Sequence, residues 1–346
     1  MPPARSRRFG RRQRTTVALG GAGFIAVVHA LAAQTAGMQV TAVASGRGSS
    51  ARHLAGELDA KKVRPEDLPA GADVLVVAAP PRHHVPLALA GIRAGAHTLV
   101  EKPLAATLAG ADRLVAAADE APAVRVRCAE NLLHAPVWRH VEERRAALGT
   151  LGHLSLRTLQ PPPTWGHFTQ PLDVGGVLYD LGPHALALAL GLADEPCVGV
   201  TAALSTTRDD GADDAASVSL RFGSGLVATV EVSWVAEDTV WEAQAASDSG
   251  VLRLELLPEV LLEHDGEPVP VALRHGGEPS LEQFGYVDQL LDLVADGGRP
   301  GQTVHEARTV LEVICAAYRS AGLGGDEVPL PFTGDRELTP LQLWKG

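Results

Sequence analysis

The sequence predicts an α/β protein that opens with a doubly wound parallel sheet and continues into a second, α+β domain with a large antiparallel sheet. Short apolar strands alternate with helical segments over residues 16–128. Around residues 218–234, apolar and polar side chains alternate on both sides of a Gly-Ser-Gly turn, which indicates an antiparallel hairpin. The chain has 346 residues, enough for two domains, and its 46% hydrophobic content excludes a disordered protein.

The elements of the first domain follow in order along the chain. The expected strands cover residues 16–19, 39–44, 72–79, 98–100 and 124–128, and the expected helices cover residues 24–36, 85–94 and 109–120. The run at 72–79, Ala-Asp-Val-Leu-Val-Val-Ala-Ala, is apolar on both faces. That pattern is typical of a parallel strand buried between two layers of helices.

Charge and cysteine content exclude several classes of protein. The formal net charge of −11 argues against nucleic-acid binding, and six of the 30 basic residues lie in residues 1–16, which hold no acidic residue. We expect residues 1–14 to form a disordered basic arm. The three cysteines, at positions 128, 197 and 315, are too far apart for a disulfide scaffold or a Cys-x-x-Cys motif.

The N-terminus resembles an export signal. Residues 6–9, Ser-Arg-Arg-Phe, are similar to a twin-arginine motif, and residues 15–46 contain no charged side chain. Glycines and polar residues interrupt this stretch, no small-residue cleavage site stands out, and cleavage would remove the first strand and helix. We therefore expect a cytoplasmic protein without a membrane span, with export as the alternative.

A glycine turn follows the first expected strand. Residues 21–26, Gly-Ala-Gly-Phe-Ile-Ala, fit the G-x-G-x-x-G/A fingerprint of a dinucleotide-binding Rossmann fold. Gly21 permits the tight turn, and Gly23 lets the backbone approach a pyrophosphate. The helix that begins near Phe24 and Ile25 offers free N–H groups to the phosphates. We expect these four residues to contact the cofactor.

The end of the second expected strand bears on the choice of cofactor. An acidic residue is usual there in NAD enzymes, whereas this chain has Ser45, Gly46 and Arg47. A hydroxyl and a guanidinium suit a 2′-phosphate, which favours NADP(H) over NAD(H). The alternative is a solvated loop that happens to carry an arginine.

Several polar or special residues fall at the carboxyl ends of expected parallel strands, where ligands of such sheets bind. They are Gly21, Ser45, Pro80, Lys102 and Asn131. Lys102, one of only four lysines, lies between Glu101 and Pro103, and a partly desolvated lysine can donate a hydrogen bond or a proton to a reacting oxygen. We also expect the Lys102–Pro103 bond to be cis.

A second cluster lies at residues 175–184, where a helix is expected to begin near Pro183. Asp180 and His184 are four residues apart, and we expect the carboxylate to orient the imidazole. A histidine is a natural proton carrier between an alcohol and a ketone. A histidine followed by Ala-Leu-Ala-Leu is more often a core residue, so this alternative stays open.

Four segments occur in the order and at the spacing of one known family. They are residues 21–26, 79–84, 94–104 and 175–184. Over residues 15–332 the chain resembles the glucose–fructose oxidoreductase / inositol dehydrogenase / rhizopine-catabolism (Gfo/Idh/MocA) oxidoreductase family. The resemblance implies an NAD(P)-binding Rossmann domain at 15–133 and a substrate-binding α+β domain at 134–346. It also implies a homodimer or homotetramer formed through the open face of a mainly antiparallel sheet.

The resemblance further implies hydride transfer between nicotinamide C4 and a secondary alcohol or ketone carbon of a sugar, inositol or related polyol. Lys102, Asp180 and His184 match the catalytic residues of the family, and either Lys102 or His184 is the main proton carrier. The remaining cofactor contacts that it implies are Ala79, Pro80, His84, Glu101, Lys102 and Asn131. The substrate contacts that we expect are Lys102, Asn131, Trp165, Tyr179 and His184.

Other residues near the expected sugar pocket have competing interpretations. Trp165 could stack on a sugar ring or fill the core, and Glu130, His134 and His167 lie where the family builds its pocket. The pair at 83–84 lacks a third ligand at a suitable spacing, so we expect no metal.

Two other functions compete with a dehydrogenase. A relative could use bound nicotinamide transiently to cleave or rearrange a glycoside, and the cofactor would then not exchange with the bulk solution. A non-catalytic nucleotide-sensing regulator is the second alternative, and the presence of all three residues of the acid/base set, Lys102, Asp180 and His184, argues against it.

Overall fold

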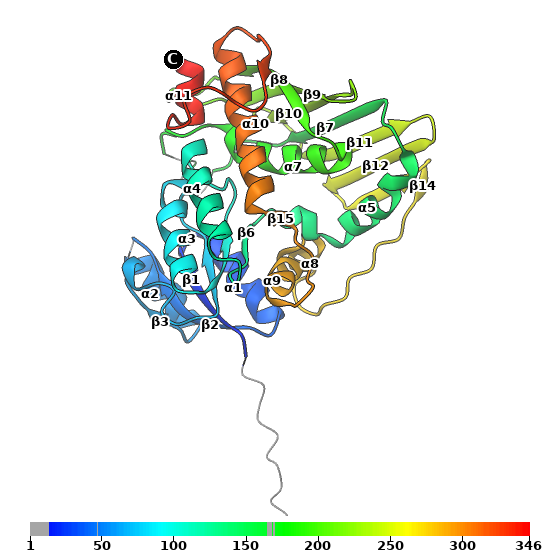
Figure 1. Cartoon of the computed structure of the whole chain (residues 1–346). Coiled ribbons are helices and arrows are strands. Elements are labelled where there is room, and N and C mark those ends of the chain that lie inside the picture. The colour runs from blue at the N-terminus through cyan, green and yellow to red at the C-terminus, as the bar shows by residue number, and fades with distance from the viewer. Residues whose placement is uncertain (1–13, 47, 165–167, 169) are drawn as a thin grey trace, which may run out of the picture.

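The computed structural model describes residues 14–46, 48–164, 168 and 170–346. Two sheets organise the molecule, one below and one at the upper right in Figure 1, and the long helix α10 runs between them. The predicted fold class is confirmed: a parallel Rossmann-type sheet precedes a mainly antiparallel one.

The first sheet has the strand order β15-β6-β5-β4-β1-β2-β3. Its strands are β1 (Thr16–Gly20), β2 (Gln39–Ala44), β3 (Lys61–Lys62), β4 (Val74–Val77), β5 (His97–Val100), β6 (Val126–Cys128) and β15 (Gln302–Thr303). The first six are parallel, whereas β15 is antiparallel to β6 and comes from a much later part of the chain. The observed strands and helices agree with the predicted ones to within a few residues.

Helices cover both faces of this sheet, because successive side chains of a strand point to opposite faces. Val17 and Leu19 of β1 pack in the cluster that includes α1 (Phe24–Thr35), α2 (Gly48–Glu57) and α9 (Tyr286–Val294). Ala18 lies in the other cluster, with α3 (His84–Arg93) and α4 (Leu108–Asp119). The apolar run predicted at 72–79 is buried on both faces for this reason.

The second sheet has the order β14-β13-β12-β11-β7-β10-β9-β8-β16. Its strands are β7 (His153–Leu159), β8 (Cys197–Ser205), β9 (Ala215–Phe222), β10 (Val227–Ser233), β11 (Val240–Ser247), β12 (Gly250–Leu257), β13 (Leu261–His264), β14 (Glu267–Pro268) and β16 (Val328–Pro329). The predicted hairpin is β9–β10, with Val218 opposite Val230. Only β7 and β10 pair in parallel.

One face of the second sheet packs against helices and the other is exposed. The helices of this part are α5 (Pro136–Leu148), α6 (Val177–Asp180), α7 (Gly182–Ala193), α10 (Val304–Gly322) and α11 (Pro340–Lys345). Helix α8 (Pro279–Gln283) packs against α9 and α1 instead, and short 3-10 turns elsewhere in the molecule cover Pro65–Asp67, Pro81–His83 and Asn131–His134. Buried and exposed residues alternate along β9, β10 and β12. The exposed face mixes valines such as Val227 and Val251 with ion-paired Arg157 and Glu231.

Helix α10 joins the two parts. It packs against α4 of the first part and against β8 and α7 of the second (Figure 1). A capping box between Thr303 and Glu306 fixes its start. The C-terminal segment adds a second tie, because the guanidinium of Arg336 binds Asp112 of α4.

Candidate active site

The carboxyl ends of five neighbouring parallel strands bring the predicted residues to one edge of the first sheet. The strands β2, β1, β4, β5 and β6 end at Ala44, Gly20, Val77, Val100 and Cys128, one to three residues before the predicted positions. The convergence that the sequence predicted therefore follows from the observed strand order.

The glycine turn after β1 fits a dinucleotide. Gly21 has a φ of +153°, and a Cβ there would lie 2.1 Å from the backbone oxygen of Ala78, so only glycine fits. A Cβ on Gly23 would meet nothing within 4 Å, so this side of the turn is open. In the described part of the chain no side chain caps α1, and its first turn, which contains Phe24 and Ile25, holds no acidic residue. The positive end of the α1 dipole therefore suits an anion.

The ribose end of the predicted cofactor site is described only in part. Ser45 lies half-buried directly after β2. Arg47, the predicted 2′-phosphate ligand, lies outside the described residues. The Nζ of Lys62 on β3 lies beside Gly48, 3.2 Å from the position that a Cβ would take there. A cation that was not predicted from the sequence, Lys62, therefore lies near the start of α2, and the role predicted for Arg47 stays a prediction.

Lys102 contacts Asp180 across the two parts of the molecule. Its Nζ donates to Asp180 Oδ1 at 2.8 Å and to the Asp180 backbone oxygen at 2.7 Å. Burial opposes the charge of this ammonium, but the carboxylates of Asp180, Glu101 and Glu130 outweigh it and raise the pKa of Lys102 above its usual value. The Lys102–Pro103 peptide bond is cis, as expected.

The local fold explains how Asp180 reaches Lys102. Asp213 accepts hydrogen bonds from the backbone N–H groups of Gly176 and Leu178, both at 2.8 Å, and so holds the start of α6. A Cβ on Gly176 would lie 1.9 Å from the backbone oxygen of Asp213, so glycine is required for this close approach. The short helix α6 then ends at Asp180, over the end of β5.

His184 is paired with Glu130, which corrects one prediction. Its Nδ1 lies 2.7 Å from Glu130 Oε1, and the glutamate side chain is 0% exposed. The expectation that Asp180 orients this imidazole is wrong. Asp180 ends α6 while His184 lies in the next helix, α7, so their spacing of four residues does not follow a single helix. The carboxylate of Asp180 faces Lys102 instead.

Glu101 belongs to a third buried pair, which the sequence analysis missed. Its Oε1 lies 2.7 Å from Nε2 of His29, and its Oε2 accepts the backbone N–H of Lys102 at 3.0 Å. Both side chains of the pair are buried, and the histidine draws down the pKa of Glu101 although burial opposes this. The signal was His29, a polar residue inside the apolar stretch 24–33 of α1.

Three predicted ligand residues have their polar atoms engaged by the protein itself. His84 is buried, with its two ring nitrogens 2.8 and 2.9 Å from the backbone oxygens of Ala79 and Pro103, so it ties the loop after β4 to the loop after β5. Tyr179 donates its hydroxyl to Ala105 at 2.9 Å, and Asn131 donates to Phe284 at 2.7 Å. These bonds hold the loops that follow the strand ends.

A pocket opens beside His184 on the inner face of the second sheet. Thr158 of β7 and Trp241 of β11 lie opposite each other in register and line it. The rings of Trp241 and His184 lie 5.5 Å apart at 38°. The indole Nε1 is buried and has no hydrogen-bond partner among the described residues. The sequence analysis did not identify these two residues, and its own candidates here, Trp165 and His167, lie outside the described residues.

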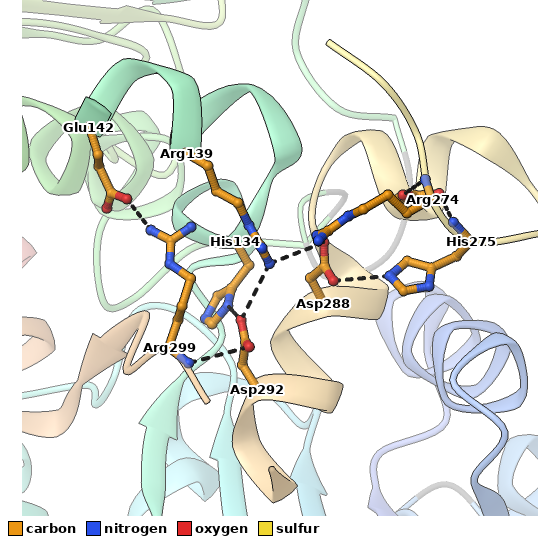
Figure 2. A network of polar contacts seen from close by, with 9 residues as sticks. His134, Arg139, Glu142, Arg274, His275, Asp288, Asp292 and Arg299 are labelled. Carbon is orange, nitrogen blue, oxygen red and sulfur yellow. Dashed lines mark hydrogen bonds and ion pairs between the residues drawn. The ribbon is translucent and has the colours of Figure 1, made fainter. Parts of the chain in front are cut away.

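His134 belongs to a separate polar network, shown in Figure 2, and not to the wall of this pocket. Its Nδ1 lies 2.9 Å from Asp292 Oδ2 on α9, and Arg139 of α5 lies between Asp292 and Asp288 of the same helix. His275, in the connection between β14 and α8, reaches Asp288 at 3.0 Å. The network fastens α9 to α5 and to that connection.

Within residues 14–46, 48–164, 168 and 170–346, no group of three or more His, Cys, Asp or Glu side chains is placed to hold a metal ion. No described helix combines the length and the apolar character needed to cross a bilayer.

Comparison with known proteins agrees with this geometry. Residues 15–128 match the family described as "Oxidoreductase family, NAD-binding Rossmann fold", and residues 143–253 match its "GFO/IDH/MocA C-terminal domain". The crystal structure of GenD2 from gentamicin A biosynthesis, in complex with NAD, superposes with a TM-score of 0.79 at 27% identity, covering 95% of this chain and 99% of that one.

Two relatives with named reactions match shorter stretches. The 1,5-anhydro-D-fructose reductase of Ensifer adhaerens is 34% identical over 164 residues, which is 45% of this chain and 49% of the relative. The dTDP-3,4-didehydro-2,6-dideoxy-alpha-D-glucose 3-reductase of Streptomyces antibioticus is 37% identical over 120 residues, or 34% of this chain and 37% of the relative. The chain thus belongs to the Gfo/Idh/MocA family of oxidoreductases, with the NAD-binding Rossmann domain of that family in its N-terminal part.

Proposed function

We propose that this oxidoreductase transfers hydride between a nicotinamide dinucleotide and the carbon of a secondary alcohol or ketone in a sugar, inositol or related polyol. The observation that carries the proposal is the pairing of two bases with two carboxylates where the two parts of the molecule meet: Lys102 with Asp180, and His184, which lines the pocket, with Glu130. Relatives named as reductases of 1,5-anhydro-D-fructose and of a dTDP-linked deoxysugar support a sugar-like substrate.

The two bases take different roles in this proposal. Two of the three N–H donors of Lys102 are used by Asp180, which leaves the third for the reacting oxygen of the substrate. The Nδ1 of His184 is engaged by Glu130, so Nε2 is the atom that takes or gives the hydroxyl proton. A bound nicotinamide supplies or accepts the hydride at C4. Burial beside the pocket keeps water from competing for either group.

The cofactor preference that we propose is NADP(H) over NAD(H). The end of β2 carries Ser45, Gly46 and Arg47 and no carboxylate, and the ammonium of Lys62 lies close to the start of α2. A 2′-phosphate would meet two cations there, whereas NAD(H) would lack its usual acidic partner for the ribose hydroxyls. Gly21, Gly23 and the first amides of α1 would hold the pyrophosphate.

We also propose that the protein acts in the cytoplasm as a homodimer or homotetramer formed through the exposed face of the second sheet. Strand β1 lies between β2 and β4, so a signal cleavage that removed it would split the first sheet. The outer face of the second sheet has no helix packed on it among the described residues, and it presents valines between its ion pairs.

Titration of the purified protein with NADPH and NADH, followed by nicotinamide fluorescence, tests the proposed function first. Binding and release of NADPH at lower concentration than NADH is expected. A panel of myo-inositol, 1,5-anhydro-D-fructose and free keto sugars is then assayed for cofactor turnover. Absence of turnover with every polyol and keto sugar would contradict the proposal. Nicotinamide that co-purifies and never exchanges would favour a glycoside-cleaving mechanism instead.

A further inference from the structure

We propose that Glu130 is the positioning residue of His184, and that the two form a buried carboxylate–imidazole pair that sets which ring nitrogen faces the substrate. The inference rests on the proposed function, since it assigns a task to Glu130 within the same site. It goes beyond the family motifs, because Glu130 lies in none of the four segments that carry the resemblance.

The geometry of the pair is that of an orienting hydrogen bond. The His184 Nδ1 and Glu130 Oε1 atoms are 2.7 Å apart, within the range of charge-assisted hydrogen bonds. Glu130 is 0% exposed, and the imidazole side chain is 10% exposed. The two residues come from different parts of the molecule, Glu130 from the end of β6 and His184 from the first turn of α7. The bond therefore also fixes the second part against the first.

No other described carboxylate is placed to orient this ring. Asp180 is bound to the ammonium of Lys102, and Glu101 is bound to His29. Glu242, which lines the same pocket, pairs with Arg157 and Arg253 on the sheet. The remaining titratable groups around Glu130 are Cys128 and Tyr286, whose pKa values are raised by burial, so both stay neutral.

The hydrogen bond decides the tautomer of the neutral ring. A carboxylate can only accept, so Nδ1 must carry the proton, and Nε2 is then the unprotonated nitrogen. His184 lines the pocket with Thr158 and Trp241, and Nε2 has no hydrogen bond to any described residue. The base that abstracts a hydroxyl proton is thereby presented to the substrate, and the carboxylate stabilises the imidazolium that results.

The second oxygen of Glu130 supports a functional reading. Oε2 is buried and has no hydrogen-bond partner among the described residues. A buried carboxylate with an unsatisfied oxygen costs folding free energy, so a purely structural role would be served better by an amide or an apolar residue. The charge is compensated only by the ammonium of Lys102 nearby and by His184 when it is protonated.

The first test needs no substrate. Protein labelled with ¹⁵N-histidine and saturated with NADPH is studied by long-range ¹H–¹⁵N spectroscopy, with His184→Asn assigning the signal. At high pH the His184 ring is expected to carry its proton on Nδ1. In Glu130→Gln the midpoint of its titration is expected to move about one pH unit lower, because the charge is lost and the hydrogen bond is retained. A proton on Nε2 in the wild type would overturn the proposal without any variant.

A matched control separates this effect from the loss of any buried glutamate. Glu312 on α10 is 6% exposed and accepts the backbone N–H of Phe332, and Glu312→Gln should leave the His184 signal unchanged. An equal shift in both variants would overturn the assignment. The spectra report the tautomer of His184 whether or not any polyol is turned over. Failure of the proposed function and failure of this inference are therefore distinguishable.

Kinetics with a substrate from the panel complete the test. Glu130→Gln is expected to lower kcat for alcohol oxidation about 100-fold or more, with the KM for the cofactor unchanged within about three-fold. The pH below which kcat/KM falls should move lower, in parallel with the spectroscopic midpoint. A loss of kcat with an unmoved pH profile would mean that Glu130 only supports the fold, and the proposal would be wrong.

Discussion

Lys102 and His184 differ in how their polar atoms are held. The ammonium of Lys102 donates hydrogen bonds to two oxygens of Asp180, and its raised pKa keeps it charged throughout the neutral range. A group that stays charged is suited to stabilising a developing alkoxide and less suited to shuttling a proton. The imidazole of His184 has its Nδ1 held by Glu130, and the residue lines the pocket. The proposed division of labour follows from this difference.

Substitution of either base tests these roles at the level of single residues. Lys102→Ala and His184→Ala should each lower turnover by about 10²- to 10⁴-fold, because each removes a group that acts only on the reacting oxygen. The affinity for NADPH, measured by fluorescence, should stay within about three-fold. Lys61→Ala, on exposed β3, is the matched control and should leave both quantities unchanged. Equal loss of cofactor binding in both variants would contradict the assignment.

Cofactor choice is also decided by single residues. Arg47→Asp should move the ratio of the NADPH and NADH dissociation constants toward NADH by about ten-fold or more, because a 2′-phosphate would then face a carboxylate. Arg93→Asp, at the C-terminal end of α3 and so at the opposite edge of the sheet, should not alter the ratio. An unchanged ratio in Arg47→Asp would show that Arg47 does not contact the 2′-phosphate.

Among the secondary-structure elements, the short helix α6 depends most on its surroundings. Its start is held by Asp213, which also accepts the hydroxyl of Tyr318, and its end presents Asp180 to Lys102. An isolated helix of this length has no stability of its own. The position of the Asp180 carboxylate is therefore set by contacts with the loop before β9 and with α10.

Gly176→Ala tests that dependence. The added methyl group would collide with the backbone of Asp213, so the free energy of unfolding should fall by about 1–3 kcal/mol and turnover should fall with it as Asp180 moves. Gly152→Ala is the matched control, because a Cβ there meets nothing within 4 Å, and its Tm should stay close to that of the wild type. Equal Tm values for both variants would show that α6 adjusts freely.

The loop before β9 should be sensitive to acid. Hydrogen bonding to Arg208, together with the backbone N–H groups of Leu172 and Ala212, lowers the pKa of Asp210 to about 2, from an ordinary value of 3.8. Because the folded-state pKa is the lower one, the stabilisation is complete above about pH 4 and is lost as the pH falls toward 2. Between these values the Tm of Asp210→Asn should therefore fall less steeply than that of the wild type. Parallel curves would refute the coupling.

In the whole molecule, the candidate active site lies where the two parts meet. The bonds from Lys102 to Asp180 and from Glu130 to His184 both join strand ends of the first sheet to the segment that includes α6 and α7. Helix α10 packs against both parts, and the strand β15, directly before it, pairs with β6 of the first sheet. The predicted domain division at residues 133 and 134 stays a prediction, and the later segment that contains β15 and α9 packs on the first part.

The proposed assembly is also a property of the whole molecule. Val227 and Val251 are 50% and 36% exposed on the outer face of the second sheet. If that face joins copies of the chain, Val227→Glu with Val251→Glu should shift the mass measured by light scattering toward the monomer, because charges would be buried at the interface. Phe24→Glu, on α1 of the first part, should not change the mass. A monomeric wild type would contradict the assembly.

The sequence by itself determined the parallel sheet, the glycine turn, the β9–β10 hairpin and the lysine at the end of β5. These features depend on local patterns: the period of apolar residues, the positive φ of Gly21 and the position of a residue relative to its strand. Such patterns act over a few neighbouring residues, so they can be read without knowing the fold.

Only the tertiary structure decided which carboxylate serves which base. The spacing of four residues favoured Asp180 as the hydrogen-bond partner of His184, but the chain breaks between α6 and α7, and Asp180 contacts Lys102 instead. The partner of His184 is Glu130, which lies 54 residues away in the sequence. Strand order and the packing of the two parts also decide two further contacts. One is the pairing of His29 with Glu101, and the other is the position of Thr158 and Trp241 beside His184. Hydrogen bonds and desolvation act between neighbours in space, and one sequence without its fold does not specify those neighbours.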